Sequence, residues 1–156
     1  RALRGLAEEA LRQEQVGDAI SAYTEALEHQ PFDMDSRRGL AAIHETKNEY
    51  DEAFEAWKAV GGLCHRAGLL DEAIKDFHRA FQLRDSDEHM VREMAEVEAR
   101  RSKTRNSAML FARYAMLQMG KGNPGAAREA LERANRLEPN LPQVTQLMSK
   151  LAAESP

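Results

Sequence analysis

Histidine and cysteine are the side chains of this sequence best suited to bind a metal ion or to act as nucleophiles. They are His29, His44, His65, His78, His89 and Cys64. No two histidines are four residues apart, no His-Glu-x-x-His or Gly-x-Ser-x-Gly string occurs, and Cys64 has no second cysteine to pair with. We therefore expect no metal, no cofactor and no catalytic residue, and we interpret Cys64 as a small core residue of a protein that is not an enzyme.

A glycine-rich segment offers a second kind of chemistry. Residues 120–125, Gly-Lys-Gly-Asn-Pro-Gly, have the Gly-x-Gly-x-x-Gly spacing that cradles the pyrophosphate of a dinucleotide. That fingerprint requires a strand before the first glycine, whereas residues 109–119 have a helical pattern. We interpret the segment as a turn between helices, and we place Gly61 at a close-packing position inside another helix.

Basic residues and methionines could contact a partner. The run Arg100, Arg101, Lys103 and Arg105 is typical of a solvated helix end, with docking of an acidic peptide or a phosphate as the alternative. Core filling is the favoured interpretation of the methionines, and an adaptable binding surface is the alternative. They are Met90, Met94, Met109, Met116 and Met119.

Composition limits the class of protein. The 156 residues are 42% hydrophobic, 31% charged and 6% aromatic, which is typical of a soluble all-α domain. The net charge of −4 gives no general attraction to nucleic acid, and no apolar run is long enough to insert into a membrane. We expect a single domain over 1–156, cut from a longer protein. Its location is unknown, with the cytoplasm favoured.

Helix-breaking and capping residues divide the chain into about nine helical stretches. These are 2–14, 17–29, 34–47, 51–66, 70–83, 87–101, 105–119, 125–137 and 141–153. The loops between them are short, so neighbouring helices should run antiparallel.

Three sets of residues recur along these stretches with the same series of intervals, which is 34, 20, 34 and 20. The first is Ala19, Ala53, Ala73, Ser107 and Ala127; the second is Tyr23, Trp57, Phe77, Phe111 and Leu131; the third is Ala26, Val60, Ala80, Tyr114 and Ala134. Small, large and small residues thus stand at i, i+4 and i+7 of one helix surface. The pattern predicts a repeat protein with a continuous helical core.

The 34-residue spacing resembles that of the tetratricopeptide repeat. The best copy spans 54–87 and is carried by Trp57, Val60, Gly61, Cys64, Gly68, Ala73, Phe77 and Ala80, with Asp85 in place of the family's final proline. A second copy ends with Tyr23, Ala26 and Pro31, and a third spans about 108–141. The resemblance implies an antiparallel helical-hairpin solenoid wound into a right-handed superhelix, and a scaffold that binds other proteins.

The 20-residue intervals depart from a regular array of such repeats. They indicate that 51–66 and 105–119 each serve two overlapping repeats, which gives a 54-residue superrepeat of three helices, the step from Ala19 to Ala73. We therefore expect these two helices to pack against helices on both sides. The last stretch, 141–153, is interpreted as a polar capping helix.

The resemblance also implies a ligand face made by the first helix of each repeat. Matching that face to this sequence gives Arg4, Glu8, Arg38, Lys58, His65, Arg66, Arg92 and Arg100 as peptide-binding candidates, followed by Met109, Met116 and Met119. The basic bias favours an acidic protein or peptide partner. The Lys-x-x-Gly-Asn pattern of chaperone-tail binders is missing from the first helix, so that specificity is not assigned. An accessory or oligomerisation domain, with homo-oligomers, is the alternative function.

Overall fold

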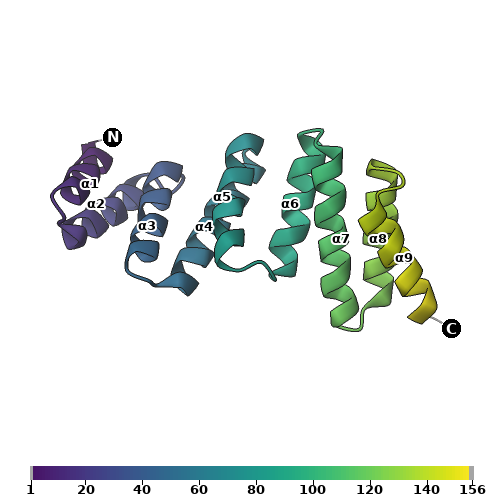
Figure 1. Ribbon diagram of the computed structural model, residues 1–156. Helices are drawn as coiled ribbons and strands as arrows, with labels where there is room; N and C mark the ends of the chain where they lie inside the picture. The colour runs from purple at the N-terminus through teal and green to yellow at the C-terminus, as the bar shows by residue number, and fades with distance from the viewer. Residues whose placement is uncertain (1, 155–156) are drawn as a thin grey trace. The chain divides into compact units, whose positions relative to one another are not determined.

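A computed structural model describes residues 2–154, which form nine helices and no strand (Figure 1). The helices are α1 (Ala2–Arg12), α2 (Val16–His29), α3 (Met34–Thr46), α4 (Tyr50–Arg66), α5 (Leu70–Leu83), α6 (Glu88–Arg100), α7 (Thr104–Gly120), α8 (Pro124–Leu137) and α9 (Pro142–Glu154). The predicted all-α fold is confirmed, and both ends of every predicted helix lie within two residues of the observed ends. None of the described helices is long and apolar enough to span a bilayer.

The helices recur in a 54-residue register. The bounds of α2, α5 and α8 differ by 54 at both ends, and so do those of α3, α6 and α9. The bounds of α4 and α7 also differ by 54 residues at both ends. The last residues of α1 and α4, Arg12 and Arg66, differ by 54 as well. Over the described residues, the predicted three-helix superrepeat is therefore confirmed, and positions that differ by 54 can be compared as counterparts.

The chain divides into two compact units, the first ending at Arg84 and the second beginning at Asp85. In the first unit, which contains α1 to α5, α4 packs against both α3 and α5. In the second unit, α7 packs against both α6 and α8. The two helices predicted to serve two repeats each thus have neighbours on both sides.

The turns follow the same register. Five helices end before a residue with a left-handed backbone, with φ between 59° and 79°; these residues are Glu14, Asn48, Gly68, Ser102 and Gly122. After each of them an amide bonds back across the turn, as when Leu69 N–H donates to the Cys64 carbonyl at 2.9 Å. This Schellman-type closure satisfies the last carbonyls of the helix. The glycine-rich segment at 120–125 is such a turn, as predicted.

The three recurring sets form the core of both units. All their members are buried except Tyr114, which is half-buried. Glycine allows two of the large rings to reach a neighbouring helix. A Cβ at Gly61 would lie 2.7 Å from the Phe77 ring, and one at Gly39 would lie 2.3 Å from the Tyr23 ring. Such distances are too short for any side chain, so each ring packs directly against the backbone of the neighbouring helix.

Candidate functional site

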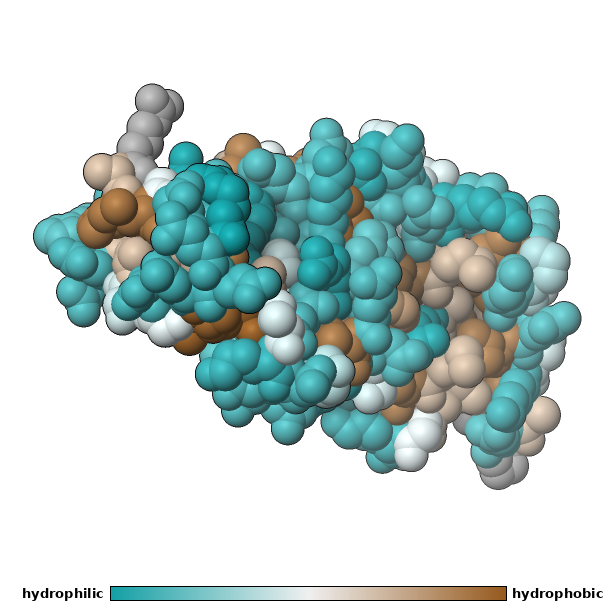
Figure 2. Space-filling model, turned by 60° about the vertical axis from the view of Figure 1, so that its left-hand side comes forward, coloured by the Kyte–Doolittle hydropathy of each residue, from teal (hydrophilic) through white to brown (hydrophobic). Residues whose placement is uncertain are grey.

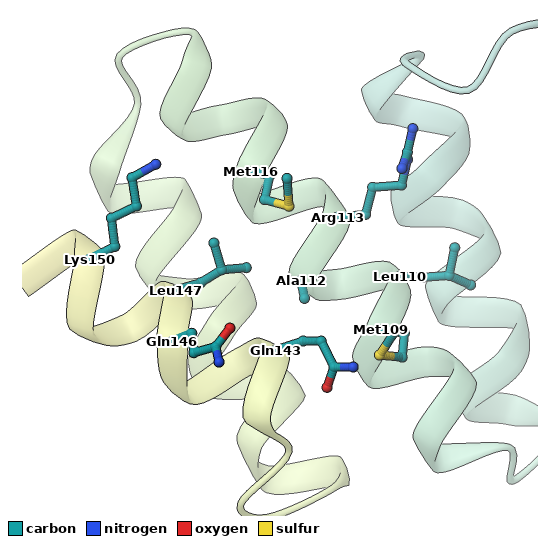
Figure 3. Close-up of a pocket in the computed structure, with 9 residues that line it drawn as sticks. All are labelled: Met109, Leu110, Ala112, Arg113, Met116, Gln143, Gln146, Leu147 and Lys150. Atoms are coloured by element: carbon teal, nitrogen blue, oxygen red, sulfur yellow. The ribbon is translucent and has the colours of Figure 1, made fainter.

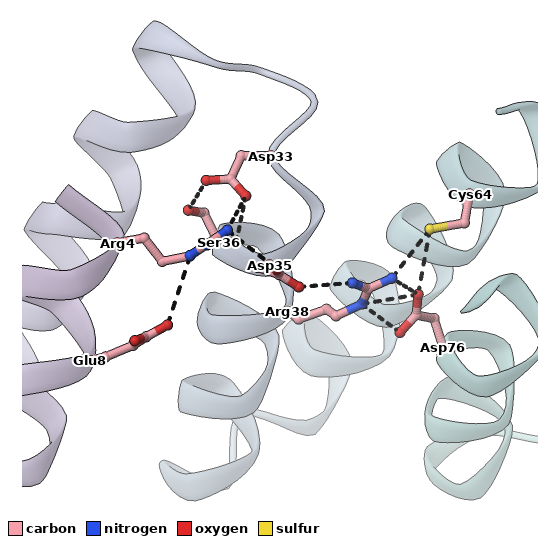
Figure 4. Close-up of polar contacts among 8 residues, drawn as sticks. All are labelled: Arg4, Glu8, Asp33, Asp35, Ser36, Arg38, Cys64 and Asp76. Carbon is pink, nitrogen blue, oxygen red and sulfur yellow. Dashed lines mark hydrogen bonds and ion pairs between the residues drawn. The ribbon is translucent and has the colours of Figure 1, made fainter. Parts of the chain in front are cut away.

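Arg38, a predicted ligand-binding residue, is held inside the first unit (Figure 4). From α3 its guanidinium donates to both carboxylate oxygens of Asp76 on α5, the shortest bond being 2.8 Å, and to Asp35 at 3.0 Å. The Asp76 side chain is only 6% exposed. The hydrogen bonds to Asp76 raise the pKa of Arg38 above its ordinary value, so the guanidinium stays charged. Its charge is thus matched within the unit, where it fastens α3 to α5.

Arg4 is tied to the same part of the first unit. Its guanidinium lies 3.1 Å from Asp35, 3.4 Å from Asp33 and 3.8 Å from Glu8. Asp33 also accepts a hydrogen bond from the Ser36 amide and so caps α3. Burial raises the pKa of Asp33, but the bonds from Ser36 and the Arg4 charge outweigh burial, and the net shift is downward. The structure brings Arg4 and Glu8 together, as part of a network of ion pairs within the first unit.

Cys64 lies beside the Arg38–Asp76 pair. Its Sγ is fully buried, accepts from Arg38 at 3.3 Å and donates to Asp76 at 3.7 Å. Burial raises the pKa of the thiol to about 11, against an opposing effect of the Arg38 charge. The thiol is therefore protonated at neutral pH, and the interpretation of Cys64 as a core residue is confirmed.

The remaining predicted ligand residues are divided between the units. On α4, Lys58 and His65 are half-buried and Arg66 is exposed, with the Lys58 ammonium 5.6 Å from the centre of the Phe54 ring. On α6, Arg92 and Arg100 are exposed, and Arg92 lies 5.7 Å from the Tyr114 ring. Arg4, Glu8 and Arg38 share the network around Asp35 in the first unit, whereas Arg92 and Arg100 belong to the second unit.

An open groove lies between α7 and α9 in the second unit (Figure 3). Its volume is about 550 Å³, and it is lined by Met109, Leu110, Ala112, Arg113, Met116, Gln143, Gln146, Leu147 and Lys150. Met109 is 40% exposed and Met116 is 55% exposed. In the space-filling view, hydrophobic surface shows between hydrophilic side chains on the part of the molecule that carries the C-terminal helices (Figure 2).

Helical spacing places this lining on facing surfaces. On α7, Met109 and Met116 are seven residues apart with Ala112 between them, so the small residue leaves space between two flexible apolar side chains. On α9, Leu147 lies between the polar Gln143 and Lys150. The lining thus combines an apolar floor with a polar rim.

The rim of the groove is cationic. Its lining contains two basic side chains, Arg113 and Lys150, and no carboxylate. Arg113 donates to the backbone carbonyl of Asp85 at 3.1 Å and forms an ion pair with its carboxylate at 2.8 Å. Lys150 is exposed on α9. Because Arg113 is paired with Asp85, the positive charge at this apolar groove comes mainly from Lys150.

Core filling is the wrong interpretation for two methionines of the sequence. Met90 and Met94 are buried and Met119 packs against the core, as that interpretation predicts, whereas Met109 and Met116 face the groove. Their counterparts one superrepeat earlier are Glu55 and Gly62, which are not large core residues. That comparison was the signal that could have separated them from the core methionines.

No group of three or more His, Cys, Asp or Glu side chains within residues 2–154 is arranged to hold a metal ion. The His44 side chain is 34% exposed, and its Nδ1 lies 3.1 Å from Glu49. That hydrogen bond lowers the pKa of Glu49. The contact ties the end of α3 to the start of α4.

Comparison with known proteins identifies the repeat. Family models of the tetratricopeptide repeat match residues 4–59 and residues 110–141, which together make up more than half of the chain. No curated protein matches the sequence.

Several solved structures have a similar arrangement of helices. MamA is 14% identical, with 88% of this chain and 90% of that chain covered and a TM-score of 0.40. YrrB, described as a TPR protein with an unusual peptide-binding site, is 15% identical, with 94% and 90% covered and a TM-score of 0.40. TPR-like repeats of a putative kinesin light chain from Podospora anserina are 14% identical, with 98% and 92% covered and a TM-score of 0.42.

The paired helices, the recurring small and large core residues and the open surface groove define a helical-repeat scaffold of the protein-interaction class. The family models make this assignment specific. The chain belongs to the tetratricopeptide-repeat family.

Proposed function

We propose that this chain is a non-enzymatic scaffold that binds a helical or extended segment of a partner protein in the groove between α7 and α9. The observation that carries the proposal is the pair of exposed methionines, Met109 and Met116, on the floor of an open groove of about 550 Å³. Methionine adapts its shape to a bound apolar side chain. Rigid packed helices on both sides limit the entropy that the scaffold loses on binding.

The groove favours a partner segment with apolar anchors and acidic flanks. Apolar side chains spaced three or four residues apart on a helix match the floor, and carboxylates match the cationic rim. Arg92 and Arg100, two of the predicted ligand residues, are exposed on α6 in the same unit but do not line the groove. Arg4 and Arg38 contribute less, because their charges are already paired with carboxylates of the first unit.

Peptide binding tests this function. The probes are two labelled amphipathic peptides of about four helical turns, with the same Leu and Met anchors and either Glu or Lys on the polar face. We expect the acidic probe to bind, and the variant Met109→Ser/Met116→Glu to weaken it at least about tenfold through lost apolar contact and added like charge. Fluorescence anisotropy measures both affinities.

The matched control is Phe32→Ser, which removes an apolar side chain that is 72% exposed on the first unit. It should leave the affinity of the acidic probe unchanged. Equal binding of the acidic probe to the wild type and to the methionine double variant would rule out the groove as the binding site.

A further inference from the structure

A second pocket of the second unit lies on the other side of α7 from the groove of the proposed function. Its volume is about 280 Å³, and its lining comes from α6, α7 and α8. On α7 the lining residues are Phe111 and Tyr114, whereas the groove is lined by Met109 and Met116. With about 3.6 residues per helical turn, these two pairs point to opposite sides of the helix. The pocket is therefore a separate site.

The first unit shows what fills the corresponding place there. Arg38 on α3 donates to the Asp76 carboxylate on α5, with a shortest bond of 2.8 Å, and that carboxylate is only 6% exposed. The counterparts of this pair, 54 residues later, are Arg92 on α6 and Ala130 on α8, and both line the pocket. The second unit has thus kept the arginine and lost the carboxylate. The space that a carboxyl group would fill beside Ala130 belongs to the pocket.

The neighbours of Arg92 also differ from those of Arg38. The counterpart of Cys64, which accepts from Arg38, is Gln118. Gln118 donates to Glu88 at 2.9 Å and does not line the pocket. The contact that the structure gives Arg92 is with the ring of Tyr114, at 5.7 Å. Its guanidinium is exposed, so it can accept a carboxylate from outside the chain.

Two other substitutions add hydrogen-bond donors to the pocket. Tyr114 replaces Val60 and brings a phenol, and Arg136 replaces Gln82 and brings a second guanidinium. Arg133 lines the pocket as well, but it donates to Glu96 at 2.6 Å, so its charge is already matched. The cationic groups open to a ligand are therefore Arg92 and Arg136, both of which are exposed.

The pocket also carries two carboxylates, Glu129 and Glu132, both exposed on α8. Their counterparts in the first unit are Lys75 and His78. A ligand with negative charge alone would be attracted by the arginines and repelled by these glutamates. A ligand with a carboxylate beside a basic group matches both signs.

We infer that this pocket binds an acidic side chain of a partner protein, at a point where basic residues flank it in the partner. The partner's carboxylate takes the part that Asp76 plays in the first unit and pairs with Arg92. Its basic neighbours pair with Glu129 and Glu132. Residues four apart lie on the same face of a helix, so a glutamate with a lysine four residues to either side presents this set of charges.

A titration followed by NMR of the ¹⁵N-labelled protein tests the inference. The probe is a peptide of about four helical turns, with one central glutamate, a lysine four residues to either side and alanine elsewhere, so it has no large apolar anchor for the groove. Its partner probe has glutamine in place of the glutamate. We expect the glutamate probe to shift the Nε–H signal of Arg92 and to bind about tenfold more tightly than the glutamine probe. The Arg38 signal should not move, because Asp76 already occupies that guanidinium.

Variants locate the binding. Ala130→Asp supplies the missing carboxylate from within the chain, so it should shift the Arg92 signal without any peptide and weaken the glutamate probe about tenfold. Arg92→Gln should weaken it as much, and its exposed position preserves the fold. The double variant Glu129→Gln/Glu132→Gln should weaken it less. Arg128→Gln is the matched control, because it removes the same charge from an exposed position of α8 outside the pocket.

The inference is overturned if neither probe binds, or if the wild type binds both probes equally. Binding that is unchanged in Arg92→Gln overturns it as well. The groove variant Met109→Ser/Met116→Glu should bind the glutamate probe as the wild type does. That result separates this pocket from the proposed function, since either site can fail its test without the other.

Discussion

The three-helix set α3, α4 and α5 of the first unit and the set α6, α7 and α8 of the second share one register but are fastened differently. In the first, Arg38 reaches across to the buried Asp76. Their counterparts in the second are Arg92, which is exposed, and Ala130, which cannot pair with it. The backbone arrangement therefore does not depend on this ion pair. It depends on the recurring small and large core residues, which both sets retain.

The second set is held by polar contacts at the ends of its helices. Glu88 accepts hydrogen bonds from Gln118 at 2.9 Å and Lys121 at 2.8 Å, and the buried Glu98 pairs with Arg101 and accepts from Asn106 at 2.9 Å. These contacts leave the middle of α7 open on the side of Met109 and Met116. The contacts of this set join α6 to α7 and involve neither Met109 nor Met116, which line the groove on the side of α9.

Removing Asp76 should produce the largest difference between the units. Asp76→Ala leaves the partly buried Arg38 without its main carboxylate, and loss of one member of a buried pair costs about 3–5 kcal/mol. Urea unfolding measures the change. Asp51→Ala is the control, because Asp51 is 86% exposed and pairs with Arg84 at the surface, where such pairs contribute about 1 kcal/mol or less. Equal costs for the two variants would mean that Asp76 does not fasten the first unit.

A smaller effect is expected where glycine meets an aromatic ring. Gly61→Ala puts a methyl group 2.7 Å from Phe77 and should cost about 1–3 kcal/mol. In the second unit the counterparts are Ala115 and Leu131, which share one core cluster. Gly61→Ala/Phe77→Leu copies that pair into the first unit and should recover part of the loss. A double-mutant cycle in urea measures the coupling, and additive costs would contradict it.

The Cys64 thiol makes the stability of the first unit depend on pH in the alkaline range. The thiol has a folded pKa of about 11 and an ordinary pKa of 9.0, so it ionises first in the unfolded chain. Stability is therefore fully present below pH 9 and declines as the pH rises toward 11. Cys64→Ala, which copies its counterpart Ala10, should decline less over this range than the wild type. Free energies of unfolding at pH 8 and pH 10.5 test this, and parallel declines would contradict it.

The smallest expected effect is a change in how the stability of the second unit depends on acid pH. Hydrogen bonds from Lys121 and Gln118 lower the pKa of Glu88 below 4.5. The stability that Glu88 provides is thus present above pH 4.5 and is lost as the pH falls through its folded pKa. Glu88→Gln should flatten this acid loss slightly, whereas Glu132→Gln, at an exposed position, should leave it unchanged. Midpoints of urea unfolding at pH 6 and pH 3 are compared, and identical losses in the wild type and Glu88→Gln would contradict the assignment.

Features set by near neighbours in the sequence could be predicted. The helix ends follow from turn and capping residues, such as Asp87, which accepts from the Met90 amide at 2.9 Å. The shared roles of α4 and α7 follow from the 20-residue intervals, because a buried stripe must face every helix that covers it. Local residue types were sufficient to predict the helix ends, and spacing was sufficient to predict the shared helices.

Features set by distant partners could not be predicted. Arg38 was expected on a ligand face, but its carboxylate partner Asp76 lies 38 residues away, and nothing in the local pattern indicates that pairing. The groove depends on α9, whose polar Gln143 and Gln146 line it without filling it, so Met109 and Met116 remain exposed. A helical pattern indicates which face of α7 is apolar, but not how completely a later helix covers it.

The register of the turns also indicates how such a chain can be lengthened. The residues that follow α2, α5 and α8 and cap them are Gln30, Arg84 and Glu138, which occupy equivalent positions in three successive copies of the superrepeat. A tandem copy of residues 31–84 adds one complete three-helix superrepeat, so every later helix keeps the same neighbours. A copy of a single helical hairpin would instead change which helices are shared between two repeats. The segment that can be duplicated in a gene without altering the neighbours of each helix is therefore longer than the repeat that defines the family.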